Sequence, residues 1–134
     1  MDDETLLRAF EACTLPPAAL GHREHVRVAW LCLRARPRFE DAAQRFCAGL
    51  RRFAQAHGKT GLYHETITWA YLALVNERMQ GREPGRGEKC FDDFAAANED
   101  LFEAGLGAIK GLYERGVLGS ERAKGAFLLP RVIR

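Results

Sequence analysis

The chain has 134 residues, 47% of them hydrophobic, so it is about one domain long and can bury a sizeable core. Its 20 basic and 18 acidic residues give a net charge of +2 without any block of like charges, which argues against nucleic acid or an anionic membrane as the partner. The apolar runs are too short to span a bilayer, and the acidic start MDDETLLRAF is unlike a signal peptide, so we expect a cytoplasmic protein.

The first half of the chain has the hydrophobic periodicity of α-helices. We predict helices, in chain order, over residues 3–12, 22–36, 39–57 and 63–79. Pro16 and Pro17 break the chain after the first helix, and Pro37 ends the second. The third carries an apolar stripe from Phe39 to Phe53, in steps of four and three residues, which marks one face of a helix.

The second half is also predicted to be helical, but less regularly. The stretch GREPGRGE, residues 81–88, is a loop by composition and a candidate mobile connection. A helix is expected to follow from Phe91 to Phe102, and then a glycine-interrupted helix over residues 106–114. A short last helix, SERAKGAF, would be capped by Ser120.

No strand pattern of useful length occurs, so the predicted fold class is all-α. With about five to six helices and short connections, the expected architecture is a compact single-domain helical bundle over residues 1–134. An exposed face of the first helix, or of the helix that starts at Phe91, would allow a homodimer.

The four cysteines, Cys13, Cys32, Cys47 and Cys90, form no C-x-x-C pair. Cys32 and Cys47 fall within apolar helical patterns, so we expect them to be small buried hydrophobic residues, not metal ligands. A cytoplasmic setting also disfavours disulfides.

Histidines gather in two short stretches, GHREHVRVAW at 21–30 and LYHETITW at 62–69. The four histidines of the chain are His22, His25, His57 and His64. If the second, third and fourth predicted helices are antiparallel neighbours, all four reach the same end of the bundle. Each also lies on or beside a core-facing stripe of its helix. The sequence therefore predicts a polar site at this end.

The first hypothesis for this site is a small metal-binding protein or metal-dependent enzyme. His22 and His25 would bind the ion from one helix face, and His64 would supply a third imidazole, which leaves a position open for water or substrate. Glu24 and Glu65 would complete the site or orient a ring, and Glu65 would otherwise act as general base. Three imidazoles suit a divalent zinc, iron, copper or nickel ion.

The second hypothesis needs no metal. His64 would act with Glu65 as general acid or base, while Arg23 and a histidine bind an anionic small-molecule ligand. Two helix N-termini at the same end would favour an anion there. Catalytic roles are thus assigned to Glu65 and Arg23. Further lining of the site is expected from Glu24, His57, Tyr63, Thr68 and Tyr71.

The third hypothesis is a helical interaction module whose histidines are structural. His57, just before Gly58, suits a helix C-terminus, where a partly positive ring meets the helix dipole. Tyr63 and Tyr71 would then be core residues, and Asn98 a satisfied core amide. The sequence leaves open whether the protein is an enzyme.

The motifs H-x-E-H at 22–25 and Y-H-E-T-I-T at 63–68, with the final stretch SERAKGAFLLP, resemble a family of small bacterial all-helical proteins of unknown function. The resemblance runs from Gly21 to Pro130 and implies a stand-alone domain, but it implies no chemistry. The family often has an acid after the proline. This chain has Arg131 there, so any role of that acid is absent.

Overall fold

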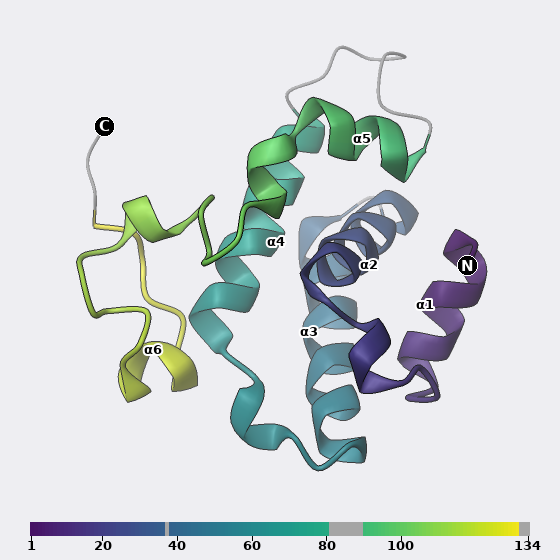
Figure 1. Ribbon diagram of the computed structural model, residues 1–134, viewed down its shortest axis with the longest axis horizontal. Helices are drawn as coiled ribbons and strands as arrows, with labels where there is room; N and C mark the ends of the chain where they lie inside the picture. Colours follow the sequence, from purple (N-terminus) through teal and green to yellow (C-terminus); the bar gives the residue numbers. More distant parts are fainter. Residues whose placement is uncertain (37, 81–89, 132–134) are drawn as a thin grey trace. The chain divides into compact units, whose positions relative to one another are not determined.

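The computed structural model describes residues 1–36, 38–80 and 90–131 (Figure 1). Within these residues the chain forms six α-helices and four short 3-10 turns, and it forms no strand. The all-α prediction is therefore confirmed. The predicted loop at 81–88 lies outside the described residues.

The chain divides into two compact units, Met1–Tyr63 and His64–Arg134. Unit 1 contains α1 (Asp3–Glu11), η1 (Pro17–Ala19), α2 (His22–Ala35), α3 (Phe39–Ala56) and η2 (Thr60–Leu62). Unit 2 contains α4 (Glu65–Gln80), α5 (Phe91–Ala97), η3 (Glu99–Phe102), η4 (Lys110–Leu112) and α6 (Glu121–Gly125). That both belong to one domain over residues 1–134 stays a prediction.

Unit 1 is a bundle in which α1, α2 and α3 pack on one another. Asp2 caps α1, because its carboxylate accepts the Thr5 backbone N–H at 2.7 Å. The Phe10 ring of α1 stacks on Phe46 and Phe53 of α3, with centroids 6.5 and 5.8 Å apart. The predicted apolar stripe of the third helix is thus the face that α1 covers.

Gly49 brings α1 and α3 close together. A Cβ atom at this position would lie 2.7 Å from a carbon of the Phe10 ring. Glycine inside a helix costs about 1 kcal/mol relative to alanine. The packing of Phe10 against the bare backbone of α3 offsets that cost.

Two partly buried ion pairs join α1 to its neighbours. Arg45 of α3 donates from Nε and Nη2 to the two carboxylate oxygens of Glu11, both at 2.7 Å. Arg27 of α2 donates to Asp3 at 2.9 and 2.6 Å. The contact of Arg45 with Glu11 is bidentate, whereas both bonds of Arg27 go to Asp3 Oδ1. Bidentate contacts are stronger and more directional than single hydrogen bonds between exposed groups.

Unit 2 is built on α4. Its core cluster consists of the buried residues Ala70, Tyr71, Ile109 and Tyr113. Partly buried hydrophobic residues surround this cluster: Ile67, Leu74, Leu106, Ala108, Leu112, Val117, Leu118 and Leu128. One face of α4 is therefore covered by irregular chain from the second half of the sequence, with α6 packed against the same helix.

The prediction of a helix over residues 106–114 is wrong. The chain there forms turns, with only the 3-10 turn η4 as regular structure. Gly105 and Leu106 take φ angles of 66° and 63°, which an α-helix cannot contain. Gly107 and Gly111 further lower the helix propensity of this stretch.

The helix predicted from Phe91 to Phe102 is interrupted at Asn98. The Asn98 amide donates to the Phe94 carbonyl at 2.9 Å and accepts from Arg78 Nη1 at 3.0 Å. A side chain that binds the backbone in this way competes with the helix, so α5 ends at Ala97 and η3 follows. Asn98 is 5% exposed, and the prediction of a satisfied core amide is confirmed.

Ser120 caps α6 as predicted, because its hydroxyl accepts the Ala123 backbone N–H at 3.1 Å. The helix ends at Gly125, earlier than predicted, since Ala126 already has the extended dihedrals φ −145° and ψ 146°. At Ala126 and Leu128 the chain is held by side chains of unit 2, as described below.

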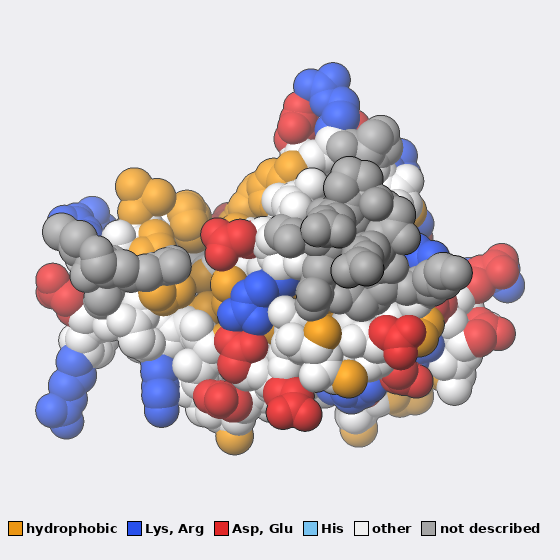
Figure 2. All heavy atoms as spheres, turned by 90° about the horizontal axis from the view of Figure 1, so that it is seen from above, with side chains coloured by type: hydrophobic (Ala, Val, Ile, Leu, Met, Phe, Trp, Pro, Cys, Tyr) orange, Lys and Arg blue, Asp and Glu red, His pale blue; other side chains and the backbone are white. Residues whose placement is uncertain are grey.

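None of the described helices combines the length and the apolar composition that crossing a bilayer requires. In the view of Figure 2, acidic and basic side chains lie close to one another over the visible face. This agrees with the nearly balanced charge of the sequence.

Candidate functional site

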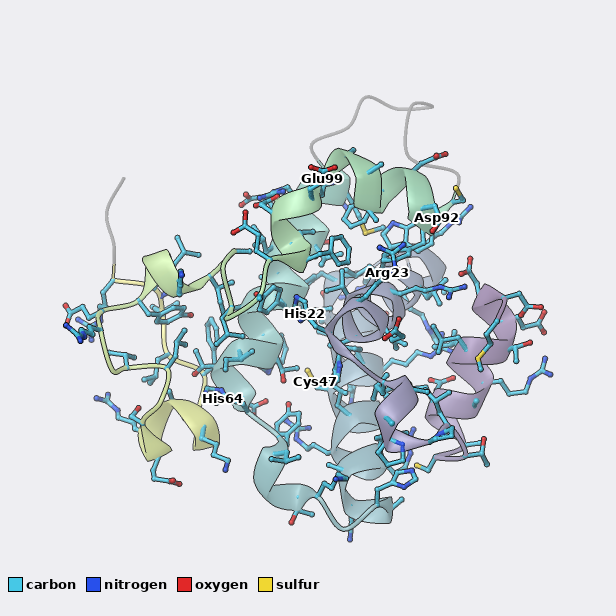
Figure 3. All side chains as sticks on the ribbon, in the orientation of Figure 1. His22, Arg23, Cys47, His64, Asp92 and Glu99 are labelled. Atoms are coloured by element: carbon cyan, nitrogen blue, oxygen red, sulfur yellow. The ribbon has the colours of Figure 1, made fainter. Side chains whose placement is uncertain are left out.

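The predicted site residues are divided between the two units. Unit 1 holds His22, Arg23, Glu24 and His25 at the start of α2, and also His57 and Tyr63. Unit 2 holds His64, Glu65, Thr68 and Tyr71; Figure 3 labels His22 and Arg23 on α2 and His64 just before α4. A site that combines His22, His25 and His64 would need both units, and it stays a prediction.

Local hydrogen bonds shape the first turn of α2. Glu24 Oε1 accepts the Gly21 backbone N–H at 3.1 Å, as the glutamate of a capping box does. His25 Nδ1 contacts the Gly21 carbonyl oxygen at 2.9 Å. A carbonyl only accepts hydrogen bonds, so Nδ1 carries the proton and Nε2 of the neutral ring keeps its lone pair.

The electrostatic surroundings favour a neutral His25. Burial lowers the pKa of His25, the hydrogen bond to Gly21 opposes this shift, and the neighbouring His22 lowers the pKa further. His22 and Arg23 are exposed. The start of α2 therefore presents a half-buried neutral imidazole beside an exposed imidazole and an exposed guanidinium.

His57 is the C-terminal cap residue of α3, at the helix end where it was predicted. Its Nε2 donates to the Cys13 carbonyl at 3.1 Å, and its ring lies 4.5 Å from the Phe53 ring. These contacts tie the end of α3 to the turn after α1. Nearby, the Arg51 guanidinium lies 5.1 Å from the centre of the Tyr63 ring.

His64 lies outside the helix that was predicted to contain it, because α4 begins at Glu65. His64 Nδ1 accepts the Ile67 backbone N–H at 3.0 Å, as an N-cap side chain does. Its Nε2 donates to the Leu118 carbonyl at 2.7 Å. Both ring nitrogens are thus used within unit 2, and ligation of a metal would require the loss of one of these bonds.

Thr66 is not among the predicted site residues. It is fully buried, and its hydroxyl donates to the Ala126 carbonyl at 2.7 Å and accepts the Leu128 backbone N–H at 3.0 Å. The Tyr113 hydroxyl donates to the Leu128 carbonyl at 2.8 Å. A polar residue inside the first turn of an apolar helix is the signal that could have found it.

The remaining candidate residues, Glu65, Tyr71 and Thr68, lie on α4 and are partly or fully buried. Glu65 Oε1 accepts the indole N–H of Trp69 at 3.0 Å, one turn further along α4. Tyr71 is buried in the core of unit 2, as the third hypothesis predicted. Burial raises the pKa of Tyr71. Thr68 is half-buried on α4.

Among residues 1–36, 38–80 and 90–131, no three histidine, cysteine, aspartate or glutamate side chains come together as a group that could hold a metal ion. The four cysteines are free thiols. Cys32 and Cys47 are buried as predicted, and burial raises the pKa of Cys32 to about 11, which disfavours its reactive thiolate.

Comparison of the chain with family models, curated proteins and solved structures gives no match. The resemblance to a family of small bacterial helical proteins therefore stays a prediction.

Proposed function

We propose that the protein binds a divalent transition metal through His22 and His25, the H-x-x-H pair at the start of α2. The observation that supports this is the hydrogen bond from His25 Nδ1 to the Gly21 carbonyl at 2.9 Å. Metal-binding histidines usually donate their second ring N–H to such an acceptor, which orients the ring and leaves the other nitrogen for the ion. Zinc, iron, copper and nickel are the ions that imidazole suits.

Two imidazoles leave coordination positions for water, for a substrate or for a further protein ligand. His64 is the predicted third ligand, but its two ring nitrogens bond to Ile67 and Leu118. Giving up either bond would cost about 1–3 kcal/mol if the backbone group stayed buried. We therefore propose His22 and His25 as the required ligands, and the experiment below tests whether His64 joins them.

In an enzyme, the bound ion would polarise a substrate or activate a water molecule. The exposed Arg23, next to both ligands in the sequence, would bind an anionic group of that substrate. Four free thiols suit a reducing compartment, so a cytoplasmic location is part of the proposal.

A metal-free role for the same residues is the second candidate. The lone pair on Nε2 of a neutral His25 also suits a general base, and Arg23 would again bind the anion. For His57 and His64, the hydrogen bonds to Cys13 and Leu118 favour a structural role.

The deciding experiment is elemental analysis of untagged protein, followed by titration with zinc, iron, copper and nickel. The variants are His22→Gln and His25→Gln, and His57→Gln is the matched control because it removes an imidazole outside α2. We expect about one ion per chain in the parent and the control, and loss of the ion in both α2 variants.

The variant His64→Asn separates the two possible ligand sets. Asparagine keeps an oxygen that can cap α4, so the helix start is preserved while the imidazole is lost. Loss of the ion in this variant would make His64 a third ligand, and retention would leave the pair alone. The proposal is wrong if the parent takes up none of the four ions, or if His22→Gln and His25→Gln take up as much as the parent.

A further inference from the structure

A shallow surface depression of about 270 Å³, wide open to solvent and called the hollow below, lies where α2 ends and α3 begins. Arg36, Asp41, Gln44 and Arg45 line it, and all four belong to unit 1. Because α2 rises about 1.5 Å per residue, the hollow is roughly 20 Å along the helix from His22. It is therefore separate from the proposed metal ligands.

The two arginines that line the hollow have N–H groups that a ligand could accept hydrogen bonds from. Arg36 is exposed and makes no ion pair or hydrogen bond with the described residues. Arg45 is held by Glu11 through Nε and Nη2, and its Nη1 has no hydrogen-bond partner among the described residues. The ion pair with Glu11 fixes the direction of the guanidinium plane, so Arg45 is oriented before any ligand arrives.

Charges of both signs lie around the hollow. The hydrogen bond from Arg45 lowers the pKa of Glu11, and the positive charges of Arg52 and Arg36 lower it further. Three guanidinium groups thus act on one carboxylate. Asp41 adds a second carboxylate, exposed, in the wall of the hollow.

We propose that this hollow binds a small zwitterion, a molecule with a carboxylate and an ammonium group such as a free amino acid. The carboxylate would accept hydrogen bonds from Arg36, from Arg45 Nη1 and from the amide of Gln44. The ammonium group would donate to the carboxylate of Asp41. A lone anion would meet repulsion from Asp41, and a lone cation would meet repulsion from Arg36.

The size of the hollow agrees with a small ligand. Pockets for drug-sized molecules hold about 300–1,000 Å³. An open depression of about 270 Å³ with three exposed lining residues would hold a small polar molecule only weakly, so we expect a Kd of about 1 mM or above. This site does not depend on the metal proposal, and either one can fail alone.

The test is NMR titration of the ¹⁵N-labelled full chain with glycine, acetate and methylammonium as three separate probes. We expect glycine to shift the side-chain signals of Arg36, Gln44 and Arg45 with a millimolar Kd. Acetate and methylammonium each lack one of the two charges, so each should bind about fivefold more weakly or worse.

Two variants and two controls locate the binding. Arg36→Gln and Asp41→Asn should each weaken glycine binding by about fivefold. Arg38→Gln and Glu40→Gln remove the same charges from an exposed arginine and glutamate that pair with each other nearby, and they should leave the glycine affinity unchanged. All four residues are exposed, so the substitutions should not unfold the chain.

The proposal is overturned if acetate binds as tightly as glycine, because the hollow would then be a simple anion site. It is also overturned if glycine shifts no signal of the lining residues well above millimolar concentration. If Arg36→Gln and its control Arg38→Gln weaken glycine binding equally, the binding depends on the overall charge of the surface and not on a specific site.

Discussion

The hydroxyl of Thr66 is both a donor to Ala126 and an acceptor from Leu128, and the side chain is fully buried. Removing the hydroxyl would leave two backbone groups of the last segment without their partner. We expect Thr66→Val to lower the free energy of unfolding by about 2 kcal/mol. Thr66→Ser keeps the hydroxyl and loses one methyl group, so it should cost about 1 kcal/mol.

Urea denaturation of the parent and of both variants measures these values. The order of stability is the result that matters: parent, then serine, then valine. A valine variant as stable as the parent would show that the two hydrogen bonds contribute nothing to stability.

The partners of Thr66 and His64 could not be predicted from the sequence. The motif Y-H-E-T-I-T stood out because histidine, glutamate and threonine are chemically active, but two of these side chains bind backbone groups. Their partners Ala126 and Leu118 lie 60 and 54 positions away in the chain. Hydrophobic periodicity reports on neighbours three or four residues apart, so it carries no information on such partners.

At the level of elements, the contact between α1 and α3 through Glu11 and Arg45 should depend on pH. Arg45 lowers the pKa of Glu11 below its usual value of 4.5. The ion pair therefore stabilises the fold fully above about pH 4.5, and the contribution is lost as the pH falls through the lowered folded value. Lowering the pH should therefore weaken the contact between α1 and α3.

The variant Glu11→Gln tests this. At pH 7 it should be about 1 kcal/mol less stable than the parent, because it loses the charged partner of a partly buried arginine. The difference should shrink below about pH 4.5 and vanish in stronger acid. Thermal unfolding at a series of pH values measures it. The exposed pair of Glu4 and Arg8 provides the control, since Glu4→Gln should have a much smaller effect at pH 7.

The helices that were predicted well begin and end at residues that cap or break a helix. The helices α1, α2 and α3 lie within one residue of their predicted bounds. Asp2 marks the start of α1, and prolines and polar turns mark where the helices stop. The stretch 106–114 has helical spacing but no helix. Its geometry depends on the positive φ angle of Leu106, a non-glycine residue whose conformation composition does not reveal.

At the scale of the whole molecule, the prediction of a single domain has a direct test. Each compact unit contains one of the two tryptophans, Trp30 in unit 1 and Trp69 in unit 2. The variants Trp30→Phe and Trp69→Phe each leave one fluorescent reporter. Units of about 60–70 residues bury only about 60% of their surface and are marginal alone. We therefore expect both reporters to follow one cooperative transition in urea.

Far-UV circular dichroism should give the same midpoint as the two reporters. Transitions that differ in midpoint would show that the units unfold separately and would contradict the single domain. The midpoint of each variant is also compared with the parent by circular dichroism, because Trp30 is buried and its replacement lowers stability by itself.

The bonds of Thr66 have a consequence for the order in which the protein takes shape during translation. All residues of unit 1 have been synthesised at Tyr63, whereas Leu128, a backbone partner of Thr66, lies 62 positions beyond it in the chain. At about 5–20 residues per second, a ribosome needs roughly 3–12 s to make that stretch. Until Leu128 has been made, the hydroxyl of Thr66 lacks both of its backbone partners, so we expect the segment with Ala126 and Leu128 to join unit 2 only at the end of synthesis.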